Sequence, residues 1–507
     1  MNISLILAAV ALVPQPAKLV ETGGVTKNAE IRYVTDAAVP AEGYRLKVAA
    51  DGITVTSSDA AGLFYAGITL AQLKDGKAWP CVEIEDAPAY RWRGAHLDEC
   101  RHFFGKETVK QMLDLMAQHK LNRFHWHLTE DQGWRLDIPG YPELVKYGAV
   151  RSASVRHGQR ATKGSKEDAD KLNGVKYGPY FYTEADIREI VAYAAERHIV
   201  IVPEIELPGH VFAALAAYPE FACVPANMAS REPRLVWGIE KDVLCLGNDK
   251  AIKFMEDVLD YVCRLFPGDV VHIGGDECPQ VRWKDCPKCQ ARIKAEGLKD
   301  EHGLQPWITR HFVKFLEARG KRALGWDEYL LGDVPKSAIG MSWRTRRQGA
   351  GHELVSGAQA AVRGHDVVMT PNKFCYLDYG QCLPNDPFQY IGGKLPLEMC
   401  YSFDPCADVP AEARAHILGG QCNNWSEYTW NEYDLEWKMW PRTCAMAEVL
   451  WTAPSTRDCW DFFKRMEIHR RRLIAQGVNC APLRQTPKAS SRRQYPAFRR
   501  QDSINTT

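Results

Sequence analysis

The alternation of short β-type runs with amphipathic helical stretches, from about residue 90 onwards, most constrains how this chain can fold. Several of these runs are separated by a segment whose apolar residues recur with helical spacing. Eight runs have the length and composition of strands: 93–97, 123–128, 199–203, 270–273, 323–326, 338–343, 366–370 and 417–422. Parallel strands joined by helices close into a barrel at this number, so the sequence predicts an α/β fold with a (β/α)8 TIM-type barrel.

Three of the intervening stretches predict helices with one buried face. Their apolar residues fall on a single helical stripe within 109–116, 187–194 and 255–263. Thr183, with Asp186 three residues later, gives the second stretch a near capping box. The later helices have a less clear pattern, so the barrel is predicted mainly from the strands.

The chain before residue 88 reads differently and predicts a small α+β domain at residues 14–88. Short β-type runs precede a helix-like run at 60–73, and Asp86-Ala87-Pro88 closes the domain. The β-type runs are 31–33, 44–48 and 53–57. The barrel would then occupy 89–480, and residues 481–507 form a polar, basic tail.

The first thirteen residues suggest export without establishing it. Residues 3–13 are apolar and contain small side chains, as in the hydrophobic part of a secretory signal, but no Lys or Arg precedes them. We therefore expect a possible signal segment at 1–13 and a periplasmic or secreted protein. A buried first strand or a mis-assigned start, in a protein that stays in the cytoplasm, is the alternative.

Composition excludes some partner classes. Lys+Arg number 64 and Asp+Glu 63, so a net charge of +1 offers no electrostatic attraction to nucleic acid or an anionic membrane surface. No apolar stretch is long enough to span a bilayer. We expect neither nucleic acid nor a membrane as partner, and the sequence does not indicate the oligomeric state.

Sixteen cysteines are spread over 507 residues, which is not the density of a small disulfide scaffold. Cys286 and Cys289 form a CxxC pair, with Cys278 nearby. A lone CxxC is weak evidence for zinc, and a loop disulfide or plain thiols are the stronger readings. We therefore assign no metal site and no cofactor from the sequence.

The end of the fourth predicted strand has a distinctive chemistry. Gly274 and Gly275 are followed at once by Asp276 and Glu277. Glycines permit a turn that aims two neighbouring carboxylates into one cleft. Two carboxylates held close together do not ionise independently, so one of them gains a raised pKa and can act as an acid near neutral pH.

The other predicted strand ends carry a mixture of tryptophans, histidines, carboxylates and an arginine. These residues are Asp98, Arg101, His125, Trp126, His127, Glu130, Asp131, Trp134, Glu204, Glu206, His210, Trp326, Trp343, Tyr376, Asp378, Trp425 and Glu427. Sugars present C–H faces that stack on aromatic rings and hydroxyls that bind carboxylates and Arg. Core packing explains any single Trp, but three at three strand ends favour a carbohydrate cleft.

Eight segments, in order, make the chain resemble the family 20 glycoside hydrolases, the β-N-acetylhexosaminidases. They are 98–101 (DECR), 125–134 (HWHLTEDQGW), 203–210 (PEIELPGH), 272–277 (HIGGDE), 325–327 (GWD), 341–343 (MSW), 376–378 (YLD) and 425–427 (WSE). The segment 13–18 also resembles the start of the family's small N-terminal domain. Glu206 stands where the family usually has Asp, which leaves its supporting role in doubt.

The resemblance implies an exo-acting, retaining enzyme that removes terminal β-linked N-acetylglucosamine or N-acetylgalactosamine from glycans. Glu277 would protonate the glycosidic oxygen and then activate water. The substrate's own 2-acetamido oxygen would attack the anomeric carbon and form an oxazolinium intermediate. Asp276 would orient the acetamido N–H and balance its charge, and Tyr376 would hydrogen-bond the acetamido oxygen.

The resemblance also implies a set of substrate-binding residues. Trp326, Trp343 and Trp425 would wall the acetamido pocket. Arg101, Glu427 and Asp378 would hold ring hydroxyls. His210 and Glu204 would lie behind the acidic pair and tune it.

Two other classes remain as alternatives. A metal-dependent hydrolase could use His125, His127, His210, His272 and Asp276 as ligands, but the tryptophans are then unexplained. A non-catalytic sugar-binding protein could use the same cleft. Within the favoured class, the preferred hexosamine, the glycan and a disaccharide-releasing variant stay open.

Overall fold

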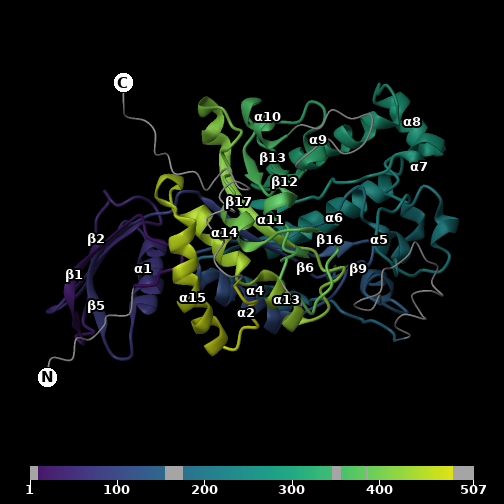
Figure 1. Ribbon diagram of the computed structural model, residues 1–507. Helices are drawn as coiled ribbons and strands as arrows, with labels where there is room; N and C mark the ends of the chain where they lie inside the picture. Colours follow the sequence, from purple (N-terminus) through teal and green to yellow (C-terminus); the bar gives the residue numbers. More distant parts are fainter. Residues whose placement is uncertain (1–9, 155–174, 345–355, 384–385, 484–507) are drawn as a thin grey trace.

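The computed structural model describes residues 10–154, 175–344, 356–383 and 386–483. A small α+β domain lies at one end of the molecule, and a barrel surrounded by helices forms the rest (Figure 1). Within the described residues, every helix is too short or too polar to cross a membrane.

The N-terminal domain is a five-stranded sheet with one helix packed on it. The sheet order is β1-β5-β3-β4-β2. Its elements are β1 (Lys18–Thr26), β2 (Ile31–Thr35), β3 (Tyr44–Ala49), β4 (Gly52–Ser57), α1 (Ala60–Leu73) and β5 (Trp79–Asp86). Burial alternates along β3 and β4, so each presents an apolar face to the helix. Asp59 caps α1 by accepting a hydrogen bond from the Gly62 N–H at 2.7 Å.

The eight predicted barrel strands all form, and they close into a parallel barrel. The strands are β6 (Trp92–Asp98), β7 (Arg123–His127), β10 (Val200–Glu204), β11 (Val270–His272), β12 (Arg322–Trp326), β13 (Ile339–Ser342), β14 (Val367–Met369) and β17 (Ile417–Asn424). Their order around the barrel follows the chain, with β17 closing against β6. The predicted α/β barrel with a small preceding domain is therefore confirmed.

Helices of very different lengths surround the barrel. They are α2 (Lys106–Gln118), α4 (Glu184–Ala195), α5 (Phe212–Ala217), α6 (Asp249–Leu265), α7 (Val281–Asp285), α8 (Pro287–Ala295), α9 (Leu304–Glu317), α10 (Gly357–Val362), α11 (Asn372–Cys375), α12 (Leu397–Tyr401), α13 (Glu432–Met439), α14 (Arg442–Trp451) and α15 (Cys459–Ala475). The near capping box at Thr183 and Asp186 is complete in α4. Two small ribbons, β8 (Thr129–Glu130) with β9 (Gly133–Trp134) and β15 (Tyr379–Gly380) with β16 (Gly392–Lys394), project from strand ends.

A buried carboxylate joins the two domains. Asp86, at the end of β5, accepts hydrogen bonds from the Tyr44 hydroxyl at 2.6 Å, from the Lys120 Nζ at 2.9 Å and from the Trp451 indole N–H at 2.9 Å. Lys120 and Trp451 belong to the barrel domain. Asp86, the last residue of the N-terminal domain's strand β5, thus also binds the barrel domain.

The first described residues include the end of the predicted possible signal segment, 1–13. Ala11, Leu12 and Val13 are buried, and the Leu12 carbonyl accepts a hydrogen bond from Arg465 on α15 at 2.6 Å. These three residues therefore belong to the packed protein, although the sequence grouped them with the possible signal segment. Residues 1–9 and 484–507 lie outside the described residues, and export stays a prediction.

Candidate active site

A cavity of about 280 Å³ opens at the carboxyl ends of the barrel strands. All ten residues predicted to form the site line it: Arg101, His210, Asp276, Glu277, Trp326, Trp343, Tyr376, Asp378, Trp425 and Glu427. They come from strand ends that are far apart in the sequence, and the closed barrel brings them together. This is the end of a TIM-type barrel where active sites lie.

The acidic pair stands on a turn that needs its glycines. Gly274 has φ +59° and Gly275 φ +95°, in the left-handed region. A Cβ on Gly274 would lie 1.9 Å from the Glu206 Oε2. Glu277 itself has φ +46°, a conformation that is uncommon outside glycine and that clusters at functional sites. The turn directs both carboxylates into the pocket.

His210 stands between the acidic pair and a second carboxylate. Its Nε2 lies 3.7 Å from both the Asp276 Oδ2 and the Glu277 Oε2, and its Nδ1 lies 2.8 Å from the Glu130 Oε1. Burial alone would lower the pKa of His210, but the charges of Glu130 and Asp276 hold it well above its usual range. The charges around His210, that of Glu130 first, therefore favour its imidazolium form.

The two acids of the pair have different pKa values. Burial, with the charges of Glu328 and Glu277, raises the pKa of Asp276 to about 8, against the opposing charge of His210. Burial also acts to raise the pKa of Glu277, but the hydrogen bond and charge of His210, with Arg344, hold it below its usual range. These shifts favour a proton on Asp276 and an ionised Glu277 near neutral pH.

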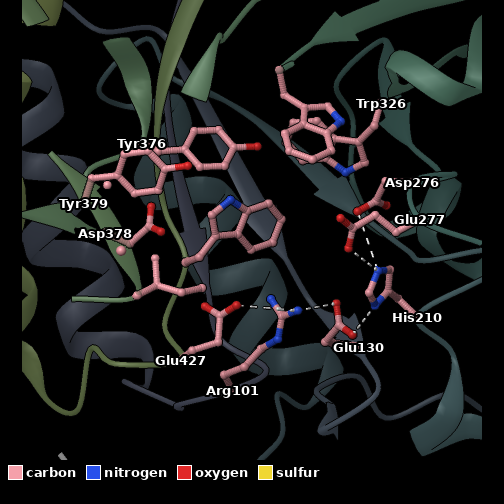
Figure 2. A pocket seen from close by; sticks show the side chains of 15 residues that line it. Arg101, Glu130, His210, Asp276, Glu277, Trp326, Tyr376, Asp378, Tyr379 and Glu427 are labelled. Atoms are coloured by element: carbon pink, nitrogen blue, oxygen red, sulfur yellow. Dashed lines mark hydrogen bonds and ion pairs between the residues drawn. The ribbon is translucent and has the colours of Figure 1, made fainter. Parts of the chain in front are cut away.

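A line of ion pairs crosses the floor of the pocket from His210 to Glu427 (Figure 2). The Arg101 Nη2 lies 3.1 Å from the Glu130 Oε2 and 4.0 Å from the Glu427 Oε1. Arg101 is fixed from behind, because its Nη1 lies 3.1 Å from the Asp98 Oδ2 and its Nε donates to the Gln132 Oε1 at 2.9 Å. The guanidinium is held in place before any ligand arrives.

Aromatic rings form the other wall. The Trp326 and Trp425 ring centroids are 5.7 Å apart, and the Trp343 and Tyr376 rings stack at 6.1 Å with 13° between their planes. Tyr376 faces the acidic pair across the cavity, and Trp326 lies beside Asp276 (Figure 2). The rings make a box with an apolar lining and carboxylates at its edges.

A single buried carboxylate holds the barrel interior behind this box. Glu204 lies 2.5 Å from the His127 Nδ1, 3.1 Å from the His125 Nε2 and 3.0 Å from the His272 Nδ1, and it accepts the Trp326 indole N–H at 2.7 Å. These three histidines do not line the cavity. Their partner is Glu204, so three of the five ligands of the metal-dependent alternative are not presented to the pocket.

Glu206 occupies a place between this interior and the acidic pair. It is buried against Gly274, and neither carboxylate oxygen has a hydrogen-bond partner among the described residues. Burial, with the charges of Asp276 and Glu204, holds its pKa well above its usual range. The side chain is therefore a neutral acid at this position, and it does not line the cavity.

The sequence did not assign every residue of the pocket. Glu130, Tyr379 and the segment 391–393 also line it. Glu130 was noted at a strand end without a role, and Tyr379 directly follows the assigned Asp378. The segment 391–393 reaches the rim because β15 pairs with β16, a contact with no local signal in the sequence.

Comparison with known proteins identifies close relatives. The description "Glycosyl hydrolase family 20, catalytic domain" matches residues 90–454, and "Glycosyl hydrolase family 20, domain 2" matches residues 7–87. A beta-hexosaminidase of Porphyromonas gingivalis is 41% identical over 93% of this chain, which spans 59% of that protein's length. A beta-hexosaminidase of Akkermansia muciniphila is 31% identical over 92% of this chain and 91% of its own.

A solved structure shows the same fold. The exo beta-N-acetylglucosaminidase from Vibrio harveyi, crystallised with N-acetylglucosamine, superposes with a TM-score of 0.81 at 30% identity. The match covers 94% of this chain and 79% of that one. Both described domains therefore have counterparts in a relative of the same family.

Proposed function

The chain belongs to glycosyl hydrolase family 20, and from this we propose that it is a β-N-acetylhexosaminidase. We propose further that it acts at chain ends, removes terminal β-linked N-acetylglucosamine or N-acetylgalactosamine, and retains the anomeric configuration. The relatives named as beta-hexosaminidases support the activity. The size of the cavity supports exo action, because about 280 Å³ lies at the small end of ligand pockets, which run from roughly 300 Å³ upwards.

Three unpaired carboxylate oxygens inside the aromatic box carry the proposal. Asp276 Oδ1, Asp378 Oδ1 and Glu427 Oε2 are buried and have no hydrogen-bond partner among the described residues. A buried acceptor without a donor is costly, so such groups mark places where a ligand supplies the donor. A sugar with several hydroxyls and an acetamido N–H supplies donors of this kind, and its ring faces suit the tryptophans.

The arrangement of the two acids favours substrate assistance. Asp276 and Glu277 are adjacent on one turn and enter from the same side of the cavity (Figure 2). A glycosidase that supplies its own nucleophile places two carboxylates on opposite sides of the scissile bond, whereas substrate-assisted enzymes do not. In our proposal the 2-acetamido oxygen bonds to the anomeric carbon as the glycosidic C–O bond breaks.

Glu277 handles the protons of both steps. It gives a proton to the departing glycosidic oxygen, which leaves as an alcohol, and then takes a proton from the water that attacks the anomeric carbon. The second attack reopens the oxazolinium ring and restores the acetamido group. Two inversions at one carbon retain its configuration.

Substrate binding must move one proton within the acidic pair. Without substrate the proton is favoured on Asp276, whose pKa burial raises to about 8. An acetamido N–H donated to Asp276 favours its anionic form, and an aglycone that covers Glu277 removes water from it and favours its neutral form. The bound pair then has the distribution that the reaction needs, with no change in its total charge.

The first test compares two matched aryl β-glycosides, one with a 2-acetamido and one with a 2-hydroxyl group. We expect cleavage of the acetamido compound with retention and little or no cleavage of the other. Equal rates would mean that the enzyme supplies the nucleophile, against the proposal. Product analysis on a longer oligosaccharide separates release of single sugars from release of disaccharides, and disaccharides would contradict the proposed exo action on one residue.

A further inference from the structure

We propose that Cys223, Cys245, Cys286 and Cys289 bind one structural zinc ion. The four residues come from two excursions of the chain beyond the strand ends, one after β10 and one after β11. Their sulfur atoms all lie within 4.8 Å of one another. This site is separate from the pocket, and the proposal does not depend on the activity proposed above.

The spacing of the sulfurs matches a tetrahedral metal thiolate. Cys245 Sγ lies 3.7 Å from Cys286 Sγ and 3.8 Å from Cys289 Sγ, and Cys223 Sγ lies 3.8 Å from Cys289 Sγ. Four sulfurs bound at about 2.3 Å to a tetrahedral ion are about 3.8 Å from one another. Three of the four residues are buried, and Cys223 is half-buried, so the site is closed to solvent on most sides.

The CxxC pair has the local geometry of a metal-binding turn. Cys286 is the N-cap of α8, Pro287 begins the helix, and Cys289 lies in its first turn. The pair therefore presents two sulfurs beside the N-terminus of a helix, where the macrodipole favours thiolate anions. Cys278, which the sequence placed near this pair, does not belong to the cluster.

The second pair arrives on a loop that is shaped to reach the first. The Cys245 N–H donates to the Phe221 carbonyl at 2.9 Å, so the chain on either side of Cys223 and Cys245 runs side by side. Gly247 lets this loop lie against the CxxC turn, because a Cβ there would lie 2.1 Å from the Lys288 carbonyl carbon. The close approach brings all four sulfurs to one point.

Zinc fits this ligand set better than disulfides do. In two disulfides the sulfurs would form two separate pairs, each with an S–S distance of about 2.05 Å. Here the Cys245 Sγ has two neighbours at similar distances, the Cys286 Sγ at 3.7 Å and the Cys289 Sγ at 3.8 Å. Four thiolates in a tetrahedron select zinc or iron, and zinc is the usual ion of closed structural sites.

The site would fix the loops that carry the active-site acids. Leu244, next to Cys245, donates its N–H to the Pro208 carbonyl at 3.0 Å, two residues before His210. Its own carbonyl accepts the Trp283 indole N–H at 2.9 Å, on the α7 helix that follows Asp276 and Glu277. Helices α7 and α8 lie at the end of the molecule away from the N-terminal domain (Figure 1).

Metal analysis of the purified full-length chain tests the proposal without any mutation. After dialysis against metal-free buffer, inductively coupled plasma mass spectrometry should find about one zinc ion per chain. Titration of the thiols with an organomercurial should release the zinc, and readdition of zinc after removal of the mercurial should restore the unfolding temperature. A chain without bound zinc, a chain with iron in its place, or a mass showing disulfides at these positions would overturn the proposal.

Cysteine variants show which residues bind the zinc ion. Cys286→Ser and Cys289→Ser should each lower the zinc content at least tenfold, whereas Cys263→Ser, which changes a half-buried cysteine on α6 outside the cluster, should leave it unchanged. Circular dichroism checks that each variant is folded. Because the wild-type metal content is measured independently, a cluster variant that does not fold leaves the proposal testable. Equal zinc in Cys263→Ser and both cluster variants would contradict the site.

Discussion

At the scale of single residues, the different roles proposed for Asp276 and Glu277 are the first to test. Glu277→Gln removes the proton donor and should lower kcat roughly a hundredfold to ten-thousandfold. Asp276→Asn should cost about a hundredfold to a thousandfold, because it removes the charge that stabilises the oxazolinium ion. Steady-state kinetics on the acetamido aryl glycoside measure both. Near-wild-type turnover in either variant would contradict its assigned role.

The pKa of Asp276 sets the expected pH dependence. In the proposed mechanism the acidic pair must hold one proton, which is lost as the pH rises through the pKa of Asp276, about 8. The pair gains a second proton only when the pH falls below the depressed pKa of Glu277. The kcat/KM of the free enzyme should therefore stay level through neutral pH and fall above about pH 8.

A variant shows which carboxyl group causes the fall in kcat/KM above about pH 8. Burial raises the pKa of Asp378 to about 8 as well, so the wild-type profile alone does not distinguish the two carboxyls. Asp276→Asn leaves Glu277 as the only proton carrier of the pair, so the limb near pH 8 should disappear and the residual activity should already fall at lower pH. A limb that persists unchanged in this variant would come from Asp378, and the account of the proton within the pair would then be wrong.

Most pocket residues were predictable one by one, because each lies at or shortly after the end of a predicted strand. Their protonation states were not predictable in this way. The sequence indicated that one of two adjacent acids would have a raised pKa, but the choice of Asp276 depends on where His210 and Arg344 lie. His210 belongs to the preceding strand end and Arg344 to a later one. Such contacts exist only after the barrel has closed.

At the scale of elements, the turn after β11 supports a sharp prediction. Gly274→Ala adds a Cβ that would lie 1.9 Å from the buried Glu206 Oε2, on a residue with φ +59°. The strained backbone alone costs about 1–2 kcal/mol, and the clash with a well-packed side chain adds about 1–3 kcal/mol. We expect a lower unfolding temperature and a displaced acidic pair with reduced kcat.

Gly297→Ala is the matched control. Gly297 has φ +64°, and no atom lies within 4 Å of its would-be Cβ, so it carries the backbone strain without the clash. Its destabilisation should be the smaller of the two, with activity unchanged. Equal loss in both variants, measured by thermal unfolding, would show that Glu206 does not restrict the turn.

The elements themselves were predicted unevenly, for physical reasons. The barrel strands were found because they form short β-type runs separated by helical stretches, and in the structure they are buried along their length. Strands β1 and β5 were missed. Most of β1 is exposed and contains Gly23 and Gly24, and a sheet-edge strand of that kind has no apolar pattern. The cysteine cluster was missed because two of its members lie far from the CxxC pair in the sequence.

At the scale of the whole molecule, the junction between the domains can be tested through Asp86. Asp86→Ala removes the partner of Lys120, whose ammonium is almost fully buried. Leaving one member of a buried ion pair alone costs about 3–5 kcal/mol. Calorimetry should show a lower unfolding temperature. Two separate transitions in place of one would show in addition that this residue couples the domains.

An exposed ion pair on the same strand provides the control. Glu85 pairs with Lys18 at 3.0 Å, with both side chains about three-fifths exposed. Surface pairs of this kind contribute about 0–1 kcal/mol, so Glu85→Ala should leave the unfolding temperature nearly unchanged. A loss in Glu85→Ala as large as that in Asp86→Ala would point to a general effect on β5 and against the buried junction.

The Glu204 network also bears on which substitutions the protein can tolerate during evolution. One carboxylate on β10 binds His125, His127, His272 and Trp326, so the three strands β7, β11 and β12 depend on a single side chain. A substitution at Glu204 removes the hydrogen bonds and ion pairs of several partners at once, so a single second substitution does not compensate for it. The rim segment 391–393 carries the exposed Ile391 and lies outside this network. Substitutions are therefore tolerated more readily at the rim than in the buried network behind the pocket.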